Sequence, residues 1–192
     1  MKPTLELDSI GISVRIFRDD ADEYGVLRAF VATVYDDAES DGESRQIGTI
    51  SGWVTWYAFS ERLLDAGDSI STDATTLSWA VKEIVEAHGD DLISSAILVD
   101  RMTLVEEWRG HKLSGALIAN LIDLLQLEPL ETVVVLEPEP QLPGGGGPYE
   151  YGPERDSAMA KLRSAYRKSG FDPWGDGPAW WRPLRATDDH SD

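Results

Sequence analysis

A basic turn that runs directly into an apolar helical pattern is the part of this sequence best suited to chemistry. In WRGHKLSGALIANLI (108–122), three basic side chains fall within four residues: Arg109, His111 and Lys112. A strand is predicted to end at Leu104, and a helix is predicted to begin near Lys112. The first N–H groups of a helix have no acceptor within it, and the helix dipole adds positive charge there. Such a turn can hold a phosphate or a pyrophosphate.

The residues of this turn are open to two interpretations, an anion site and an ordinary helix start. The helix dipole disfavours basic side chains at this end, so their presence in a chain of formal charge -18 favours an anion as a third partner. An ordinary strand, turn and helix with a basic surface would show the same residues, and the spacing leaves both interpretations open. The segment matches neither the Walker pattern nor Gly-x-Gly-x-x-Gly.

The composition limits the class of protein. With 192 residues, of which 42% are hydrophobic, we expect a single domain over 1–192 with loose ends at 1–10 and 186–192. The absence of cysteine excludes disulfides and thiolate chemistry. The first residues lack the apolar core of a signal peptide, and no apolar run approaches the roughly 18 residues of a membrane span. We therefore expect a cytoplasmic protein with no membrane partner.

The charge balance indicates the kind of partner. The chain has 17 Lys and Arg against 35 Asp and Glu. A surface this acidic repels polyphosphate backbones, which argues against nucleic acid, and it suits a cationic partner such as an amine. The general alternative is that the charge only keeps the protein soluble.

The pattern of apolar residues predicts a mixed α/β (α+β) domain whose first half is antiparallel. Three strands come first, at 12–17, 25–35 and 46–59, and 61–69 is a short helix or a loop. Helices are predicted at 72–89, 112–124 and 155–170, with Thr72 or Asp73 as the cap of the first and Gly89 as its end. Further strands are predicted at 94–104, 131–138 and 171–184, and the Pro- and Gly-rich segment 137–154 is a loop.

Two segments together resemble the GNAT superfamily of N-acetyltransferases. LVEEWRGHKLSGALI is similar to the family's coenzyme A-binding segment, in which Arg or Gln is followed by two residues, Gly, one residue, and Gly or Ala. Arg109 matches the first position, Gly110 a common additional glycine, and Ser114 the second small residue. Lys112 stands where the central glycine is expected.

The second segment, AKLRSAYRKSGFDPW, resembles the closing helix and strand of the family. Tyr166, Gly170 and Phe171 fall on that pattern, about sixty residues after the first segment. The resemblance covers 94–184. The family places two helices between its first and second strands, whereas here a helix is predicted only after the third strand, so the resemblance says more about the cofactor than about the acceptor.

The resemblance implies a mixed, mostly antiparallel sheet flanked by helices, and transfer of an acetyl group from acetyl-CoA to an amine without a metal. It implies that N–H groups near Leu104 and Val105 polarise the thioester, and that Tyr166 protonates the leaving thiolate. Packing of Tyr166 in the core with Leu162 is the alternative. The pyrophosphate would be held by the turn and helix start, which comprise Arg109, Gly110, His111, Lys112, Leu113, Ser114 and Gly115.

An amine attacks only when it is neutral, so a general base is expected. Asp100 lies inside the apolar strand ILVDRMTL, where burial would raise its pKa. The alternative is an ion pair with Arg101. Glu106 and Glu107 are expected to form a solvated turn.

The function classes that remain differ in whether the chain catalyses anything. The acceptor would be a cationic small molecule or a protein amine, and the oligomeric state stays open, a homodimer included. The rival is a non-catalytic module that binds an acyl-CoA or another phosphorylated ligand, which Lys112 in the glycine position favours. Acetylation of charged transfer RNA is disfavoured by the acidic charge and the lack of a broad basic stripe.

Overall fold

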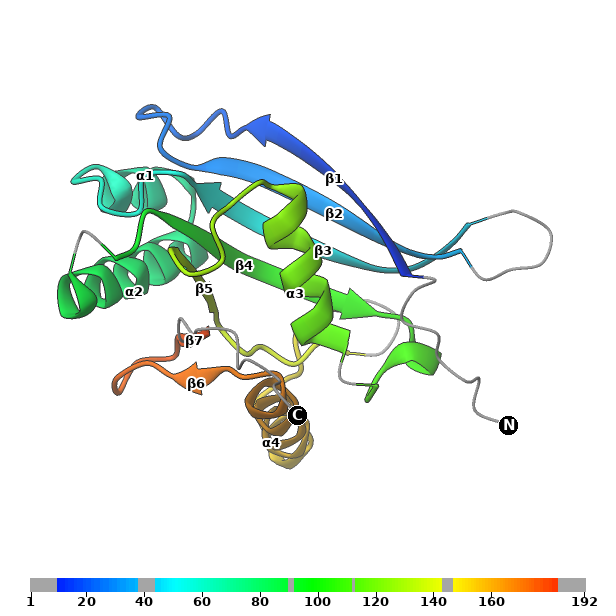
Figure 1. Ribbon diagram of the computed structural model, residues 1–192. Helices are drawn as coiled ribbons and strands as arrows, with labels where there is room; N and C mark the ends of the chain where they lie inside the picture. Colours follow the sequence, from blue (N-terminus) through cyan, green and yellow to red (C-terminus); the bar gives the residue numbers. More distant parts are fainter. Residues whose placement is uncertain (1–9, 38–43, 90–91, 112, 143–146, 183–192) are drawn as a thin grey trace, which may run out of the picture.

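A computed structural model describes residues 10–37, 44–89, 92–111, 113–142 and 147–182. Seven strands form one sheet in the order β1-β2-β3-β4-β5-β7-β6 (Figure 1). All neighbours are antiparallel except the parallel pair β4 and β5. The strands are β1 (Ile10–Arg18), β2 (Arg28–Asp36), β3 (Arg45–Thr55), β4 (Ser95–Leu104), β5 (Thr132–Leu136), β6 (Asp172–Pro173) and β7 (Trp180–Arg182).

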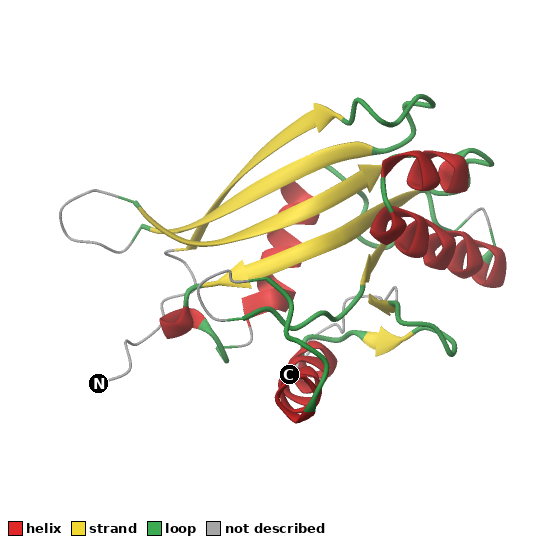
Figure 2. Ribbon diagram, turned by 180° about the vertical axis from the view of Figure 1, so that it is seen from behind, coloured by secondary structure: helices red, strands yellow, loops and turns green. Residues whose placement is uncertain are grey.

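The helices lie on both faces of this sheet, as Figures 1 and 2 show from opposite sides. The first two, α1 (Leu63–Ile70) and α2 (Thr72–His88), pack on one face, and α3 (Leu113–Leu124) packs on the other. The last helix, α4 (Pro153–Lys168), contributes Tyr166 to the core on the α3 face. The predicted mixed, mostly antiparallel sheet flanked by helices is confirmed, and it agrees with the fold that the N-acetyltransferase resemblance implies.

Alternating side chains of the central strands explain why both faces are covered. In β5, Val133 and Val135 join the core under α1 and α2, whereas Val134 and Leu136 join the core under α3. Successive side chains of a strand point to opposite faces, so an uninterrupted apolar run requires helices on both sides. This short strand was predicted from that run.

Element boundaries differ from the predictions where side chains cap or interrupt an element. The α2 cap is Ser71, whose Oγ accepts the Ala74 N–H at 3.1 Å, and not Thr72 or Asp73 as predicted. Gly89 ends α2 as predicted. β3 ends at Thr55, before the predicted 59, because the Thr55 Oγ1 accepts the Tyr57 N–H at 3.0 Å and turns the chain. The predicted loose ends lie outside the described residues, apart from Ile10 in β1.

A β-bulge interrupts the pairing of β3 with β4 at Asp100. Ser51 pairs with Arg101 and Gly52 pairs with Val99, so Asp100 is the extra residue on β4. A Cβ at Gly52 would collide with the Leu98 carbonyl oxygen and would lie 2.9 Å from the Asp100 nitrogen. Only a glycine lets β3 approach the bulge this closely, and a bulge bends its strand and redirects side chains.

The bulge coincides with the point where β4 and β5 part. β5 pairs with β4 only from Ser95 to Val99, and its last paired residue is Leu136. β4 continues along β3 to Leu104 without a strand partner on its other edge among the described residues. Asp100 and Glu137 are therefore the first residues beyond the shared register, at the carboxyl ends of two adjacent parallel strands.

We predict that Gly52→Ala lowers the free energy of unfolding by about 1–3 kcal/mol, because the new methyl group must push β3 away from the bulge. Urea unfolding measures this loss. Gly177→Ala is the matched control, since the nearest atom to a Cβ there, other than its chain neighbours, is 4.0 Å away. Equal stability of the Gly52→Ala protein and the wild type would contradict the proposed close contact.

Candidate active site

The turn between β4 and α3 is anchored in the core at one residue. After β4 the chain forms a short 3-10 helix (Glu106–Trp108), and the Trp108 side chain is buried in the core on the α3 face. Glu106 and Glu107 are exposed, as expected for a solvated turn. Gly110 has φ +80, a left-handed conformation that favours glycine, and it directs the chain into α3. The predicted strand, basic turn and helix are confirmed as elements.

Several backbone N–H groups at the start of α3 have no backbone acceptor among the described residues. The N–H groups of Trp108 and Arg109 donate to the carbonyls of Val105 and Glu106. Beyond them, several N–H groups have no backbone acceptor among the described residues, namely those of Gly110, His111, Leu113, Ser114 and Gly115. Such groups, together with the dipole of α3, provide donors for an anion.

Basic side chains gather around these donors from three elements. The Arg109 Nε donates to the Leu104 carbonyl at 2.8 Å, which holds the exposed side chain against the end of β4. Arg182 on β7 reaches the Gly115 carbonyl through Nη1 at 3.4 Å. Arg167 and Lys168 form the basic last turn of α4. Sequence reasoning missed Arg182, because only the position of β7 beside β5 brings it to α3.

Two hydroxyl groups connect the start of α3 to the end of α4. The Ser114 Oγ and the Ser169 Oγ are 2.9 Å apart, so the Ser114 hydroxyl already has a partner. Gly115 lies beside Ser169, since a Cβ at this position would be in ordinary van der Waals contact with the Ser169 carbonyl oxygen at 3.7 Å. His111 is half-buried in the turn, and Leu113 is buried in the core. Lys112, predicted as part of the same site, lies outside the described residues.

The thioester-polarising role predicted for the Val105 N–H is not supported. This group donates to the Ile47 carbonyl at 2.9 Å, which extends the contact of β3 with β4 by one residue. It is therefore not free to bond a ligand. Leu104 is paired with Gly48, and its carbonyl accepts Arg109. The edge of β4 that faces away from β3 after the bulge is a better source of donors.

Asp100 is half-buried at the bulge, and burial raises its pKa. The nearby charge of Asp73 raises the pKa further, whereas Arg101 lowers it. Burial is the largest of these effects, and no ion pair between Asp100 and Arg101 occurs in the described part of the chain. The geometry thus favours a carboxyl group with a raised pKa over the paired alternative.

Glu137, a residue that sequence reasoning missed, lies at the matching position after β5. Burial raises its pKa, and the charges of Asp73 and Glu139 raise it further, while Arg155 opposes them. The Arg155 Nη2 is 3.1 Å from the Glu139 Oε2, so this cation is engaged with the other carboxylate. The signal in the sequence was a carboxylate within a predicted apolar strand, the same kind of signal that indicated Asp100.

Tyr166 combines a buried ring with a hydroxyl that has no hydrogen-bond partner among the described residues. Burial raises its pKa to about 12, and its ring contacts Phe171 edge-on at 5.7 Å between centroids. The hydroxyl bonds to no described residue. Packing in the core is confirmed, and the acid role stays a prediction.

The described residues contain no group of three or more His, Cys, Asp or Glu side chains placed to hold a metal ion. Within the same ranges, no helix combines the length and the hydropathy that a membrane span requires.

Comparison with known proteins finds solved structures that are similar to this chain at low sequence identity and low TM-score. No protein-family model and no curated protein matches the sequence. One similar structure is the aminoglycoside acetyltransferase AAC(6')-Ib in complex with coenzyme A and kanamycin, with 18% sequence identity and a TM-score of 0.35. The match covers 81% of this chain and 65% of that chain, which is less than two thirds of its length. The KacTA–DNA complex is similar at 10% identity and a TM-score of 0.37, over 91% and 94%. At these TM-scores neither similarity assigns a function.

We predict that Tyr166 makes the stability fall between pH 10 and pH 12. In that range the unfolded chain releases the phenolic proton while the folded protein keeps it, because the folded pKa is raised to about 12. The stability present below pH 10 is therefore lost as the pH rises through 12, by roughly 3 kcal/mol for a shift of this size. Urea unfolding of wild type and Tyr166→Phe at pH 8 and pH 11 measures it.

In this experiment the Tyr166→Phe protein should lose less stability than the wild type between the two pH values. Tyr151→Phe, at a side chain that is 92% exposed, serves as the control and should follow the wild type. A difference between Tyr166→Phe and wild type that is the same at both pH values would show that this hydroxyl does not titrate abnormally.

Proposed function

We propose that the protein is an acyl-CoA-dependent N-acyltransferase that transfers an acetyl group from acetyl-CoA to an amine. The observation that carries the proposal is the separation of β4 from β5 at Asp100. On the α3 face of the sheet lie free N–H groups and basic side chains, and near the point of separation lie carboxyl groups with raised pKa. A sheet normally separates its two faces, and parted strands let groups from both faces meet.

The start of α3 supports an anion-binding role in this proposal. The N–H groups from Gly110 to Gly115 and the guanidinium of Arg109 would hold the pyrophosphate of the coenzyme. Arg182 and the last turn of α4 add positive charge nearby. The unpaired edge of β4 after Asp100 would bind the amide groups of the extended pantetheine arm, as one strand binds another.

Bound acetyl-CoA would supply an activated thioester, and carboxylate groups of the chain would remove a proton from the ammonium form of the acceptor. Asp100 and Glu137 lie where the strands part, and both have raised pKa values. An alkylammonium group has a pKa of about 10, so a carboxylate of raised pKa takes its proton, directly or through water, at a smaller cost than an ordinary one. The neutral amine can then attack.

Tyr166 would act as a hydrogen-bond donor to the leaving sulfur. A thiol has a pKa of roughly 8.5, so complete proton transfer from a tyrosine of pKa about 12 would cost about 5 kcal/mol. The raised pKa instead keeps the hydroxyl protonated, which lets it donate to a developing thiolate. We therefore propose that Tyr166 stabilises the negative charge on the leaving sulfur. The proton that finally binds to the sulfur would come from water or from another group, and not from Tyr166.

The second candidate function is binding of an acyl-CoA or another phosphorylated ligand without transfer. The engaged N–H of Val105 favours it, because one predicted polarising group is missing. Release of free thiol on mixing with acetyl-CoA and a panel of amines separates the two candidates. Binding without thiol release for every amine would favour the second candidate.

We predict that Arg109→Glu weakens coenzyme A binding by well over tenfold, because it replaces a donor to the pyrophosphate by a repelling charge. Isothermal titration with acetyl-CoA and with coenzyme A measures the affinity. Arg163→Glu is the matched control, with the same charge reversal at an exposed position of α4. The control should change the affinity less than twofold, and equal losses in both variants would exclude a specific pyrophosphate site at the turn.

We predict that Asp73→Asn moves the acidic limb of the kcat/KM profile to lower pH. The limb follows ionisation of the base, so the rate falls as the pH drops through its pKa. The Asp73 charge raises the pKa of both Asp100 and Glu137, and its removal lowers both. The profile is measured by thiol release with the best amine of the panel.

Glu86→Gln is the control for this profile, since it removes the same charge from the exposed face of α2, where Glu86 pairs with Lys82. Its limb should coincide with that of the wild type. A limb that stays in place in Asp73→Asn would mean that neither Asp100 nor Glu137 is the base.

A further inference from the structure

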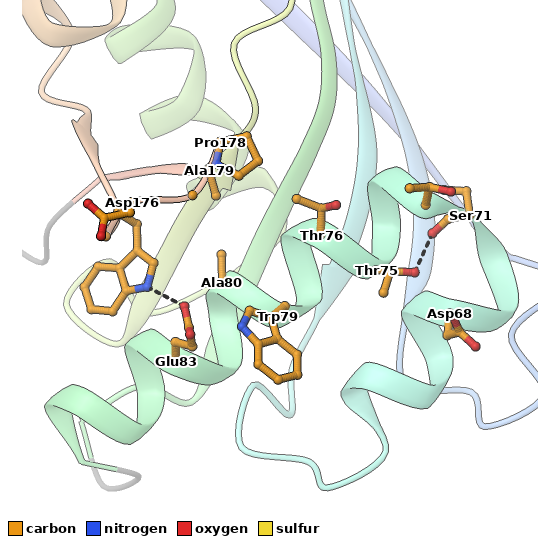
Figure 3. Close-up of a pocket in the computed structure, with 14 residues that line it drawn as sticks. Asp68, Ser71, Thr75, Thr76, Trp79, Ala80, Glu83, Asp176, Pro178 and Ala179 are labelled. Carbon is orange, nitrogen blue, oxygen red and sulfur yellow. Dashed lines mark hydrogen bonds between the residues drawn. The ribbon is translucent and has the colours of Figure 1, made fainter.

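A cavity of about 800 Å³ lies between α2 and the turn that joins β6 to β7 (Figure 3). We propose that it binds a small polycationic amine, which lies extended along α2 with an ammonium group at each end. This inference rests on the proposed function, because it names the class of acceptor.

The charged side chains among the described residues that line the cavity are all acidic. Asp68 from α1 lies at one end, and Glu83 and the turn residue Asp176 lie at the other (Figure 3). The described residues that line the cavity include no Lys, Arg or His. Two separated acidic ends favour a ligand with two separated positive charges over a ligand with one.

The part of the cavity between the acidic ends is aromatic and hydroxylated. Trp79 projects from α2 between Asp68 and Glu83. Its ring already attracts a cation, since the Lys82 Nζ lies 5.8 Å from the ring centroid. Thr72 and Thr76 line the same wall, and their hydroxyls bond to no described residue. Methylene groups can pack on the indole, while hydroxyls can accept an N–H from an internal amine.

The walls of the cavity are held in place before any ligand binds. The Trp174 Nε1 donates to the Glu83 carboxylate at 3.0 Å, which fixes the β6–β7 turn against α2. The Trp174 N–H also donates to the Ala179 carbonyl at 2.9 Å and closes that turn. A preformed site avoids the cost of ordering a loop when the ligand binds.

One end of the cavity leads towards the carboxyl groups at the separated strands. Thr72 and Thr76 line it at the start of α2, and Asp73 lies between them in the sequence. The charge of Asp73 acts on Asp100 and on Glu137. An ammonium group at this end would lie near the base, whereas the other would be held by Glu83 and Asp176. From Thr76 to Glu83 the helix rises about 10.5 Å, a length suited to the distance between the terminal nitrogens of extended spermidine or 1,8-diaminooctane.

The test is isothermal titration with spermidine, 1,8-diaminooctane and hexylamine, in 150 mM NaCl and without acetyl-CoA. Both multiply charged amines should bind at least tenfold more tightly than hexylamine. Asp68→Asn combined with Asp176→Asn should weaken spermidine binding by tenfold or more. Asp123→Asn combined with Glu128→Gln is the matched control, since it removes the same charge at exposed positions on and after α3. It should change the affinity less than twofold.

Trp79→Ala provides an independent measurement, because it keeps the net charge and removes the aromatic wall. This variant should bind 1,8-diaminooctane at least fivefold more weakly than the wild type. Because Trp79 is exposed, the variant should fold normally, which circular dichroism checks. Equal losses in the cavity and control double variants would overturn the proposal, since binding would then be diffuse attraction to an acidic surface. Absence of binding of both multiply charged amines would overturn it as well.

A separate measurement of thiol release distinguishes failure of the cavity proposal from failure of the proposed acyltransferase function. Polyamine binding that depends on Asp68, Asp176 and Trp79 without any thiol release would support the cavity and overturn the acyltransferase. Thiol release with amines that is insensitive to these three substitutions would support the acyltransferase and overturn the cavity as its acceptor site.

Discussion

The close approach of Gly52 on β3 to the bulge on β4 is the contact on which the rest of the site depends. The missing side chain lets the strands stay paired across an extra residue, and that residue is Asp100. With the bulge in place, β4 follows β3 and leaves β5, so one edge of β4 has no strand partner in the described part of the chain. In a regular sheet this edge would be closed, and the two faces would be separated by a continuous layer of backbone.

Local charge, rather than net charge, distinguishes the regions of this molecule. The chain carries a formal charge of -18, yet Arg109 contacts the end of β4, Arg182 contacts Gly115 in the first turn of α3, and Arg167 and Lys168 end α4. On the α2 side, Asp73 acts on two half-buried carboxyl groups, and the nearby cavity is lined by acidic residues. In the proposed reaction, positive side chains on one side of the gap and acidic ones on the other would suit an anionic donor and a cationic acceptor.

Burial has opposite consequences for the two kinds of acid in the site. It raises the pKa of Asp100 and Glu137 towards that of the amine, which makes them better bases. It raises the pKa of Tyr166 to about 12, which makes the phenol a poorer acid but a permanent hydrogen-bond donor at neutral pH. In the proposed reaction, the same desolvation would favour proton acceptance by the carboxylates and charge stabilisation by the tyrosine.

The sequence by itself determined the elements and several of their ends, because these follow from interactions between residues close in the chain. The repeat of apolar residues predicted α2 and its end at Gly89, and the apolar run predicted β5. The basic turn after β4 was also visible, since three basic residues near a helix start can be read locally. The cap at Ser71 and the end of β3 were missed by a few residues, because single side chains decide them.

Only the tertiary structure decided which of these residues meet. Pairing of β7 with β5 brings Arg182 to Gly115, sixty-seven positions away, and the bond of Val105 to Ile47 occupies an N–H that the sequence left open. The role of Glu137 depends on β5 lying parallel to β4 and on Asp73 lying close by. Strand register and helix placement are set by the combined packing of distant segments, so no local pattern could reveal them.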